Sequence, residues 1–199
     1  MPRVLSETDV ADFRERLCGA AERLFAERGP DAVTMRQLAA ELGVSPMTPY
    51  RYFEDKDDIL AAVRANGFNR FAAALERARD STTGARARSL AVADAYLTFA
   101  LDNPNAYKLM FDFNQPHADK YPELVAAGRR AQGTMTGYIE DALAEGLMAG
   151  DPEQIGLMFW AAIHGAVILE LSGMLPPGGA RKLFPSLDAT LMRGVRPQD

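Results

Sequence analysis

Apolar residues recur three and four positions apart along most of the chain, which is the spacing of one face of an α-helix. The strict alternation of apolar and polar residues that marks a β-strand is missing from the sequence. Glycine, proline and small polar residues interrupt the pattern, as at Gly29-Pro30 and residues 80–85. The pattern predicts helices over residues 8–28, 35–42, 46–53, 56–79 and 86–101, a short helix after Pro104, and helices over 123–148, 152–172 and 179–193.

These elements predict an all-α protein with two parts. Residues 1–60 form a three-helix domain of the helix-turn-helix kind, and residues 80–199 form a helical bundle that dimerises. A helix over about 56–79 has no break in its pattern, so we expect it to be a rigid connector between the two parts.

Two short helices joined by a tight turn are predicted within residues 34–60. Thr34 is a good N-cap and Gln37 stands at the third helical position, which is the reciprocal capping pair. Gly43 can adopt the left-handed conformation that ends the first helix. Ser45 is a second N-cap with Pro46 at the first helical position, so a recognition helix through Phe53 is predicted.

The side chains of this second helix suit DNA. Arginine and threonine can bond base edges or phosphates, methionine can touch a thymine methyl group, and tyrosine hydroxyls can bond the backbone. Lys56 follows a cap at Asp55, where the helix dipole disfavours a cation by about 0.3–1 kcal/mol, so we expect an anion such as a phosphate at that place. The candidate DNA-binding residues are Thr34, Arg36, Ser45, Met47, Thr48, Tyr50, Arg51, Tyr52 and Lys56.

Residues 10–63 resemble the DNA-binding domain of TetR-family transcriptional regulators. The likeness is carried by the Gly29 stop, the Thr34 cap, Gly43-Val44-Ser45, and the run Tyr50-x-x-Phe53-x-x-Lys56. The resemblance implies a repressor or activator that binds a near-palindromic DNA operator as a homodimer, with a C-terminal domain that senses a small molecule. Pro49 departs from the family, which has a larger aliphatic residue there. It removes one backbone hydrogen bond, so the recognition helix is expected either to start irregularly or to begin at Thr48.

Net charge weakens the expectation of a strongly basic DNA-binding surface. The chain carries a formal charge of −5, and residues 1–60 hold 8 Lys+Arg against 12 Asp+Glu. We therefore expect modest non-specific affinity and specificity that depends on a few contacts. Arg3, Arg14 and Arg16 either reach flanking phosphates or form an ordinary solvated face.

Localisation is predicted from the N-terminus and from cysteine usage. Residues 1–13 lack the apolar core of a secretory signal, so we expect a cytoplasmic protein that does not enter a membrane. Cys18 is the only cysteine and is expected to be a small buried hydrophobe rather than a nucleophile.

Aromatic and methionine residues crowd the second half of the chain. Most of them are plain core in one interpretation; in the other, they line an adaptable apolar cavity with a few polar anchors. The candidate ligand-pocket residues are Phe71, Tyr96, Phe99, Tyr107, Met110, Phe111, Met135, Tyr138, Trp160 and His164. For His164, a buried imidazole bonded to a neighbouring helix competes with a ligand or pH-sensing contact.

The most apolar stretch, residues 155–169, is shorter than the roughly 20 residues that cross a bilayer. We predict a helix buried on nearly all sides that also meets a second subunit, together with the last helix. The candidate dimer residues are Ile155, Phe159, Ile163, Val167, Phe184, Leu187 and Leu191. Trp160-x-x-x-His164-Gly165, with Asn103-Pro104 and Tyr107-x-x-Met110-Phe111 upstream, resembles the C-terminal domain called WHG in one TetR subgroup.

Enzymatic chemistry finds little support in the sequence. It has two histidines and one cysteine, no His/Cys cluster at zinc spacing, no glycine-rich phosphate loop and no nucleophile elbow. We predict no catalytic residues, no metal and no cofactor. The rival interpretation is an all-helical module that uses its N-terminal helices to bind a protein.

Overall fold

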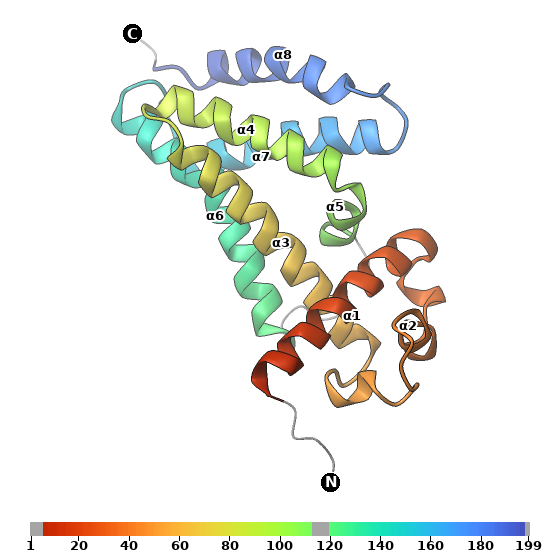
Figure 1. The fold of residues 1–199 in the computed structure, drawn as a ribbon. Coiled ribbons are helices and arrows are strands. Elements are labelled where there is room, and N and C mark those ends of the chain that lie inside the picture. Colours follow the sequence, from red (N-terminus) through yellow and green to blue (C-terminus); the bar gives the residue numbers. More distant parts are fainter. Residues whose placement is uncertain (1–5, 113–119, 198–199) are drawn as a thin grey trace. The chain divides into compact units, whose positions relative to one another are not determined.

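The computed structural model describes residues 6–112 and 120–197, and these residues form helices with no strand. The all-α prediction is confirmed. The α-helices are α1 (Glu7–Arg28), α2 (Met35–Glu41), α3 (Lys56–Asp80), α4 (Ala85–Asp102), α5 (Pro104–Met110), α6 (Pro122–Ala144), α7 (Pro152–Leu171) and α8 (Gly179–Gly194), with short 3₁₀ turns η1 (Pro30–Ala32) and η2 (Pro49–Arg51) (Figure 1).

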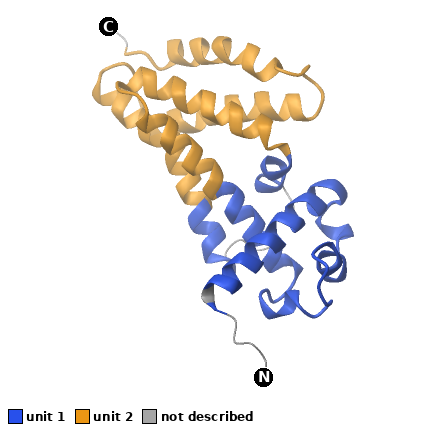
Figure 2. Ribbon diagram, in the orientation of Figure 1, with its two compact units in different colours: residues 1–68, 105–127 blue, residues 69–104, 128–199 orange. Residues whose placement is uncertain are grey.

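The chain folds into two compact units (Figure 2). Unit 1 is Met1–Phe68 with Asn105–Ala127, and unit 2 is Asn69–Pro104 with Gly128–Asp199. The predicted parts, residues 1–60 and 80–199, differ from these units because most of α5 and the start of α6 belong with the N-terminal helices. The predicted connecting helix is α3, which continues without a break from unit 1 into unit 2.

Unit 1 is built around the inner face of α1. Ser6 and Asp9 form a reciprocal capping box at its start, and Gly29, with a φ of 81°, ends it. The core gathers apolar side chains from α1, α2, α3 and α5, among them Leu17, Phe25, Leu38, Ile59 and Leu109. Cys18 is 6% exposed, and burial raises the pKa of its thiol to about 11, so it is a buried hydrophobe as predicted.

Helix α5 is fixed to α3 by two contacts of Met110. The Arg64 side chain is 2% exposed, and its Nη2 donates a hydrogen bond of 3.1 Å to the Met110 carbonyl at the end of α5. Burial lowers the pKa of the Arg64 guanidinium, and the carboxylate of Asp112 opposes that change. One turn on, Gly67 leaves space for the Met110 side chain, because a Cβ there would lie 2.8 Å from Cγ.

Unit 2 contains α4, α7, α8 and the larger part of α6, with α7 packed on both α4 and α8. Carboxylates from other helices or loops cap its elements. Both oxygens of Glu145 accept from the Ala85 amide at the start of α4, and Glu170 accepts from the amides of Gly178 and Ala180 at the start of α8. A bidentate pair between Arg86 and the buried Asp188 joins α4 to α8.

The structure corrects the prediction that α7 is buried on nearly all sides. The helix has 20 residues, and by length and composition alone it would pass as a membrane span. Only 33% of its most apolar window is buried inside the protein. Ile155, Phe159, Ile163 and Val167 lie in the core of unit 2, whereas Leu157, Met158, Ile168 and Leu169 are 39–45% exposed. The helix is apolar on two faces, of which one packs inside unit 2.

We predict that Gly67→Ala destabilises the protein. The added Cβ would overlap the Met110 side chain, and such overpacking typically costs about 1–3 kcal/mol. Gly19→Ala is the matched control, since Gly19 is also inside a helix of unit 1 but a Cβ there meets no atom within 4 Å. Removing that glycine should raise stability by up to about 1 kcal/mol. Denaturant unfolding measures both, and equal effects of the two substitutions would contradict the close approach of Met110.

Candidate nucleic-acid interface

The first helix of the predicted motif forms as expected. Thr34 caps α2, its hydroxyl accepting from the Gln37 amide at 3.3 Å while the Thr34 amide donates to the Gln37 side chain at 2.8 Å. The helix ends in a Schellman motif, in which the Gly43 amide donates to Ala40 and the Val44 amide to Ala39. Gly43 has the positive φ, 66°, that this ending requires.

The predicted recognition helix is not a regular α-helix. We call residues 45–53 the reading segment. Within it the amides of Thr48, Arg51 and Tyr52 donate to carbonyls three residues earlier, and only η2 (Pro49–Arg51) is helical. The expected cap at Ser45 is reduced to one long contact, 3.5 Å from the Met47 amide. Pro49 has no N–H to donate to Ser45, whose carbonyl accepts from Thr48 instead.

This backbone leaves several of the predicted DNA-binding side chains in solvent. Met47 is 69% exposed and Tyr50 is 49% exposed, and Ser45 and Arg51 are also exposed. Thr48 is half-buried. On the neighbouring α2 the predicted residues Thr34 and Arg36 are exposed too. Met47, Tyr50 and Arg51 are therefore an exposed group within the predicted set. Pro49 and Phe53 of the same segment are buried.

Tyr52 and Lys56, which are also predicted DNA-binding residues, make contacts with other parts of unit 1. The Tyr52 ring stacks on Phe13 of α1, with centroids 4.2 Å apart and planes at 28°. The Lys56 ammonium donates a 2.7 Å hydrogen bond to the Pro30 carbonyl between α1 and α2. The sequence predicts an anion at Lys56, but one N–H of its ammonium already donates to the Pro30 carbonyl. Asp55 caps the start of α3 as predicted, since its side chain accepts from the Asp58 amide, and the Asp58 side chain accepts from the Glu54 amide.

Arg14 has a role that the sequence did not indicate. Its Nη1 donates to the Tyr52 carbonyl, and its guanidinium lies 4.1 Å from the centre of the Phe53 ring. Arg14 therefore holds the end of the reading segment against α1 instead of reaching a flanking phosphate. Of the other two arginines considered for that purpose, Arg16 is exposed and Arg3 lies outside the described residues.

The predicted ligand-pocket residues are divided between the two units. Tyr107, Met110 and Phe111 belong to unit 1, where the Tyr107 and Phe111 rings are 4.9 Å apart. The other seven belong to unit 2. Within unit 2, Phe71 meets Tyr96 and Phe99 edge to face, at 5.1 and 5.3 Å.

A polar network joins three of the unit 2 residues. Trp160 Nε1 donates to the Tyr96 hydroxyl at 3.2 Å, and that hydroxyl lies 3.3 Å from His164 Nδ1. Tyr96 is completely buried, and burial lowers the pKa of His164. The neutral imidazole is therefore favoured, and in the tautomer that carries its proton on Nε2, Nδ1 can accept a hydrogen bond from the Tyr96 hydroxyl. This is the arrangement expected of a histidine bonded to a neighbouring helix.

Met135 and Tyr138 are closely packed. They line a cavity of about 10 Å³ together with side chains of α4, α7 and α8, which is space for no more than about one water molecule. Burial raises the pKa of the Tyr138 hydroxyl far above its usual range, and the nearby Asp188 carboxylate adds to the increase. A ligand at these residues would require side chains to move.

The predicted dimer residues also separate into two groups. Ile155, Phe159, Ile163 and Val167 are buried within the single chain, so they cannot form its outer surface. Phe184, Leu187 and Leu191 of α8 are half-buried. On α7 and just after it, the exposed apolar side chains that sequence periodicity missed are Leu157, Met158, Ile168, Leu169 and Met174.

Comparisons with known proteins cover both parts of the chain. Residues 17–63 match the family described as bacterial regulatory proteins, tetR family, and residues 89–193 match the tetracyclin repressor-like C-terminal domain. The likeness to the WHG subgroup stays a prediction.

Individual relatives are similar over most of their length. An uncharacterized HTH-type transcriptional regulator of Mycobacterium tuberculosis is 26% identical over 187 residues, which are 92% of this chain and 81% of the relative. An HTH-type transcriptional repressor of that organism is 33% identical over 129 residues, 64% of this chain and 67% of the relative. A solved structure of a protein with unknown function from Rhodococcus sp. RHA1 has a TM-score of 0.82 and 32% identity, and covers 99% of this chain and all of its own.

We predict that Arg14→Gln loosens the reading segment. The substitution removes a charge-assisted hydrogen bond and a cation–π contact, so a loss of about 1–3 kcal/mol is expected. Faster hydrogen exchange at the Tyr52 and Phe53 amides, with a lower unfolding midpoint, is the measurement. Arg16→Gln on the same helix is the control and should change stability by less than about 0.5 kcal/mol. Equal exchange rates in both variants would show that Arg14 does not hold this segment.

Proposed function

Because this chain belongs to the tetR family of bacterial regulatory proteins and is a helix-turn-helix transcriptional regulator rather than an enzyme, we propose that it is a repressor. In this proposal it binds near-palindromic DNA as a homodimer in the cytoplasm and leaves the DNA when a small apolar molecule binds. The main support is the exposed group Met47, Tyr50 and Arg51, which projects from a buried base. The relative at 33% identity is named a repressor, which supports the direction of regulation.

DNA contacts are assigned from the chemistry of the exposed side chains. Arg51 is proposed to pair with a guanine edge and Met47 to touch a thymine methyl group, while Thr48 bonds a base or a phosphate. Tyr50, Thr34 and Arg36 are proposed to bond the phosphate backbone, which positions the protein without reading sequence. Lys56 is proposed to add its remaining N–H donors to a phosphate while it keeps the bond to Pro30.

The proposed dimer uses the outer face of α7. Leu157, Met158, Ile168 and Leu169 are large apolar side chains left in solvent on one helix, and such patches mark interaction surfaces. The half-buried Phe184, Leu187 and Leu191 of α8 are proposed to extend the surface. Since each chain has one reading segment, a two-fold dimer presents two of them to a near-palindrome. A monomeric mass by light scattering would contradict the dimer.

The proposed effector site lies within residues 84–175, among the side chains of that range that belong to unit 2. The packed aromatic side chains and the Trp160, Tyr96 and His164 network would have to rearrange to admit an apolar molecule. A ligand releases DNA only if it binds the non-binding arrangement more tightly, and a coupling of about 1–3 kcal/mol gives roughly 5- to 150-fold relief. Helix α3 contributes Phe71 to unit 2 and Ile59 to unit 1, so one helix connects both sites.

We predict that Arg51→Ala changes which operator sequences are preferred, whereas Tyr50→Phe weakens binding to all sequences alike. A base contact is worth about 1–3 kcal/mol of discrimination, whereas a phosphate contact carries no sequence information. Dissociation constants on a set of single-base operator variants measure the difference. Arg129→Ala, which removes an exposed arginine of α6 in unit 2, is the control for lost positive charge. Uniform weakening by Arg51→Ala would refute its assignment to a base.

We predict that compounds which release DNA also change Trp160 fluorescence over the same concentration range. Trp160 is the only tryptophan and donates to Tyr96, so a rearranged network changes its surroundings. His164→Ala should shift the release curve and the fluorescence curve together, and Met174→Ala, at an exposed site of unit 2, should shift neither. If releasing compounds leave Trp160 silent and His164→Ala leaves release intact, this network is core only.

A further inference from the structure

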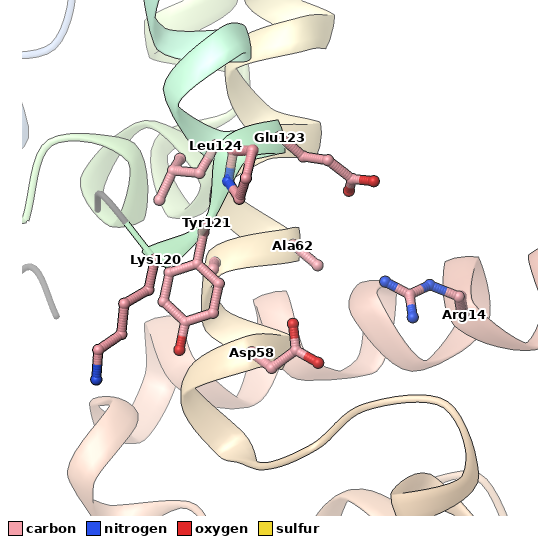
Figure 3. Close-up of a pocket in the computed structure, with 9 residues that line it drawn as sticks. Arg14, Asp58, Ala62, Lys120, Tyr121, Glu123 and Leu124 are labelled. Atoms are coloured by element: carbon pink, nitrogen blue, oxygen red, sulfur yellow. The ribbon is translucent and has the colours of Figure 1, made fainter. Parts of the chain in front are cut away.

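Unit 1 contains a cavity of about 440 Å³ that the proposed function does not use (Figure 3). We call it the α1/α3/α6 cavity. Ala61 and Ala62 of α3 and Leu124 of α6 give it apolar surface, and Tyr121 supplies an aromatic wall. The charged residues that line it are Arg14, Asp58, Lys120 and Glu123, and Pro122 completes the lining. Its volume lies within the usual range of small-molecule pockets, roughly 300–1,000 Å³.

The electrostatic surroundings of this cavity favour a cation. Burial raises the pKa of the Tyr121 hydroxyl, and carboxylates around the start of α3, including Asp55, Asp57 and Asp58, raise it further. Glu123 adds another carboxylate to the lining. The negative charge near the Tyr121 ring therefore comes from several side chains.

The two cationic side chains in the lining do not outweigh the carboxylates. Arg14 keeps its positive charge while it donates to the Tyr52 carbonyl and lies over the Phe53 ring. In the view of Figure 3 the Lys120 ammonium lies on the other side of the Tyr121 ring from Arg14 and Glu123. Arg14 and Lys120 thus supply two positive charges against the carboxylates of Asp55, Asp57, Asp58 and Glu123, and the volume of the cavity leaves room for another positive group.

We propose that the α1/α3/α6 cavity binds a small organic cation, an amine or quaternary ammonium with an apolar group, and that its occupation weakens DNA binding. The cation would lie against the Tyr121 ring face and the carboxylates of Asp58 and Glu123. The apolar group would cover the two alanines. The effect on DNA rests on the proposed function, but the binding of the cation does not.

The coupling to DNA follows from what Asp58 and Arg14 hold. Asp58 Oδ2 accepts from the Glu54 amide at 3.0 Å, immediately after the reading segment, and Arg14 donates to the Tyr52 carbonyl near the end of that segment. A cation in the cavity repels the Arg14 guanidinium and competes for the Asp58 carboxylate. The ligand therefore favours an arrangement in which Arg14 and Asp58 no longer hold the reading segment. By linkage, bound DNA lowers the affinity for the ligand by the same factor by which the ligand lowers the affinity for DNA.

The first experiment titrates the full chain with three probes of one size and different charge: benzylamine, benzyl alcohol and benzoate. The backbone amides of Ala61, Ala62 and Glu123 report binding by NMR. We expect saturable shifts with benzylamine, and weaker binding of the neutral and anionic probes by about 2- to 5-fold or more. Equal shifts with all three probes, or no saturable shift with benzylamine, would overturn the cation site.

Variants test the individual contacts. Tyr121→Leu should lower the affinity for benzylamine by about 2- to 5-fold. Tyr121→Phe should not lower it, because phenylalanine keeps the ring face. Glu123→Gln should also weaken it by about 2- to 5-fold. Its matched control is Glu153→Gln, because Glu153 also follows a proline at the second position of a helix but lies in α7 of unit 2. Equal effects of the two glutamine variants would overturn the role of Glu123.

The second experiment measures operator affinity with and without saturating benzylamine, at ionic strength matched with sodium chloride. A loss of DNA affinity is expected in the parent chain and a smaller one in Tyr121→Leu. Unchanged DNA affinity at saturation, or an equal loss in both proteins, would overturn the coupling. A chain that binds no DNA at all would refute the proposed function, while the NMR titration would still decide the cation site.

Discussion

The missing N–H of Pro49 is the constraint on which the shape of the reading segment depends. A segment with few helical hydrogen bonds of its own has little reason to keep one conformation in water. Its shape is therefore supplied from outside, by Arg14 on the Tyr52 carbonyl, by the stacking of Tyr52 on Phe13, and by the burial of Phe53. The reading segment therefore keeps its shape only while it is packed against α1.

Local features were predictable from the sequence because they depend on neighbours in the chain. The capping pairs of Thr34 with Gln37 and of Asp55 with Asp58 involve residues three apart, and the structure forms both. The turn at Gly43 needs only the conformational freedom of glycine. The irregular start of the recognition helix also follows from a local property, the absence of an N–H at Pro49, but the loss of a regular α-helix through Phe53 was not predicted.

Tertiary contacts were not predictable in the same way. Arg14 and Tyr52 are separated by 38 residues. No feature of the sequence near either residue shows whether the Arg14 guanidinium bonds to the protein or is available to a phosphate. The prediction of which α7 residues are exposed was wrong for another reason. A helix that is apolar on two sides has little periodic contrast, so the spacing of Ile155 and Phe159 could not tell the inner face from the outer.

Charge completes the account of how a chain with a formal charge of −5 can work on DNA. Most acids of residues 1–60 lie on α1 or around the start of α3, where Asp55, Asp57 and Asp58 suit the positive end of the helix. The exposed part of the reading segment instead presents Met47, Tyr50 and Arg51. Low basic charge reduces the salt-dependent, sequence-independent part of DNA affinity, so a larger share must come from base contacts. An acidic helix start next to a reading segment whose one charged residue is Arg51 therefore favours discrimination between sites over tight binding to any DNA.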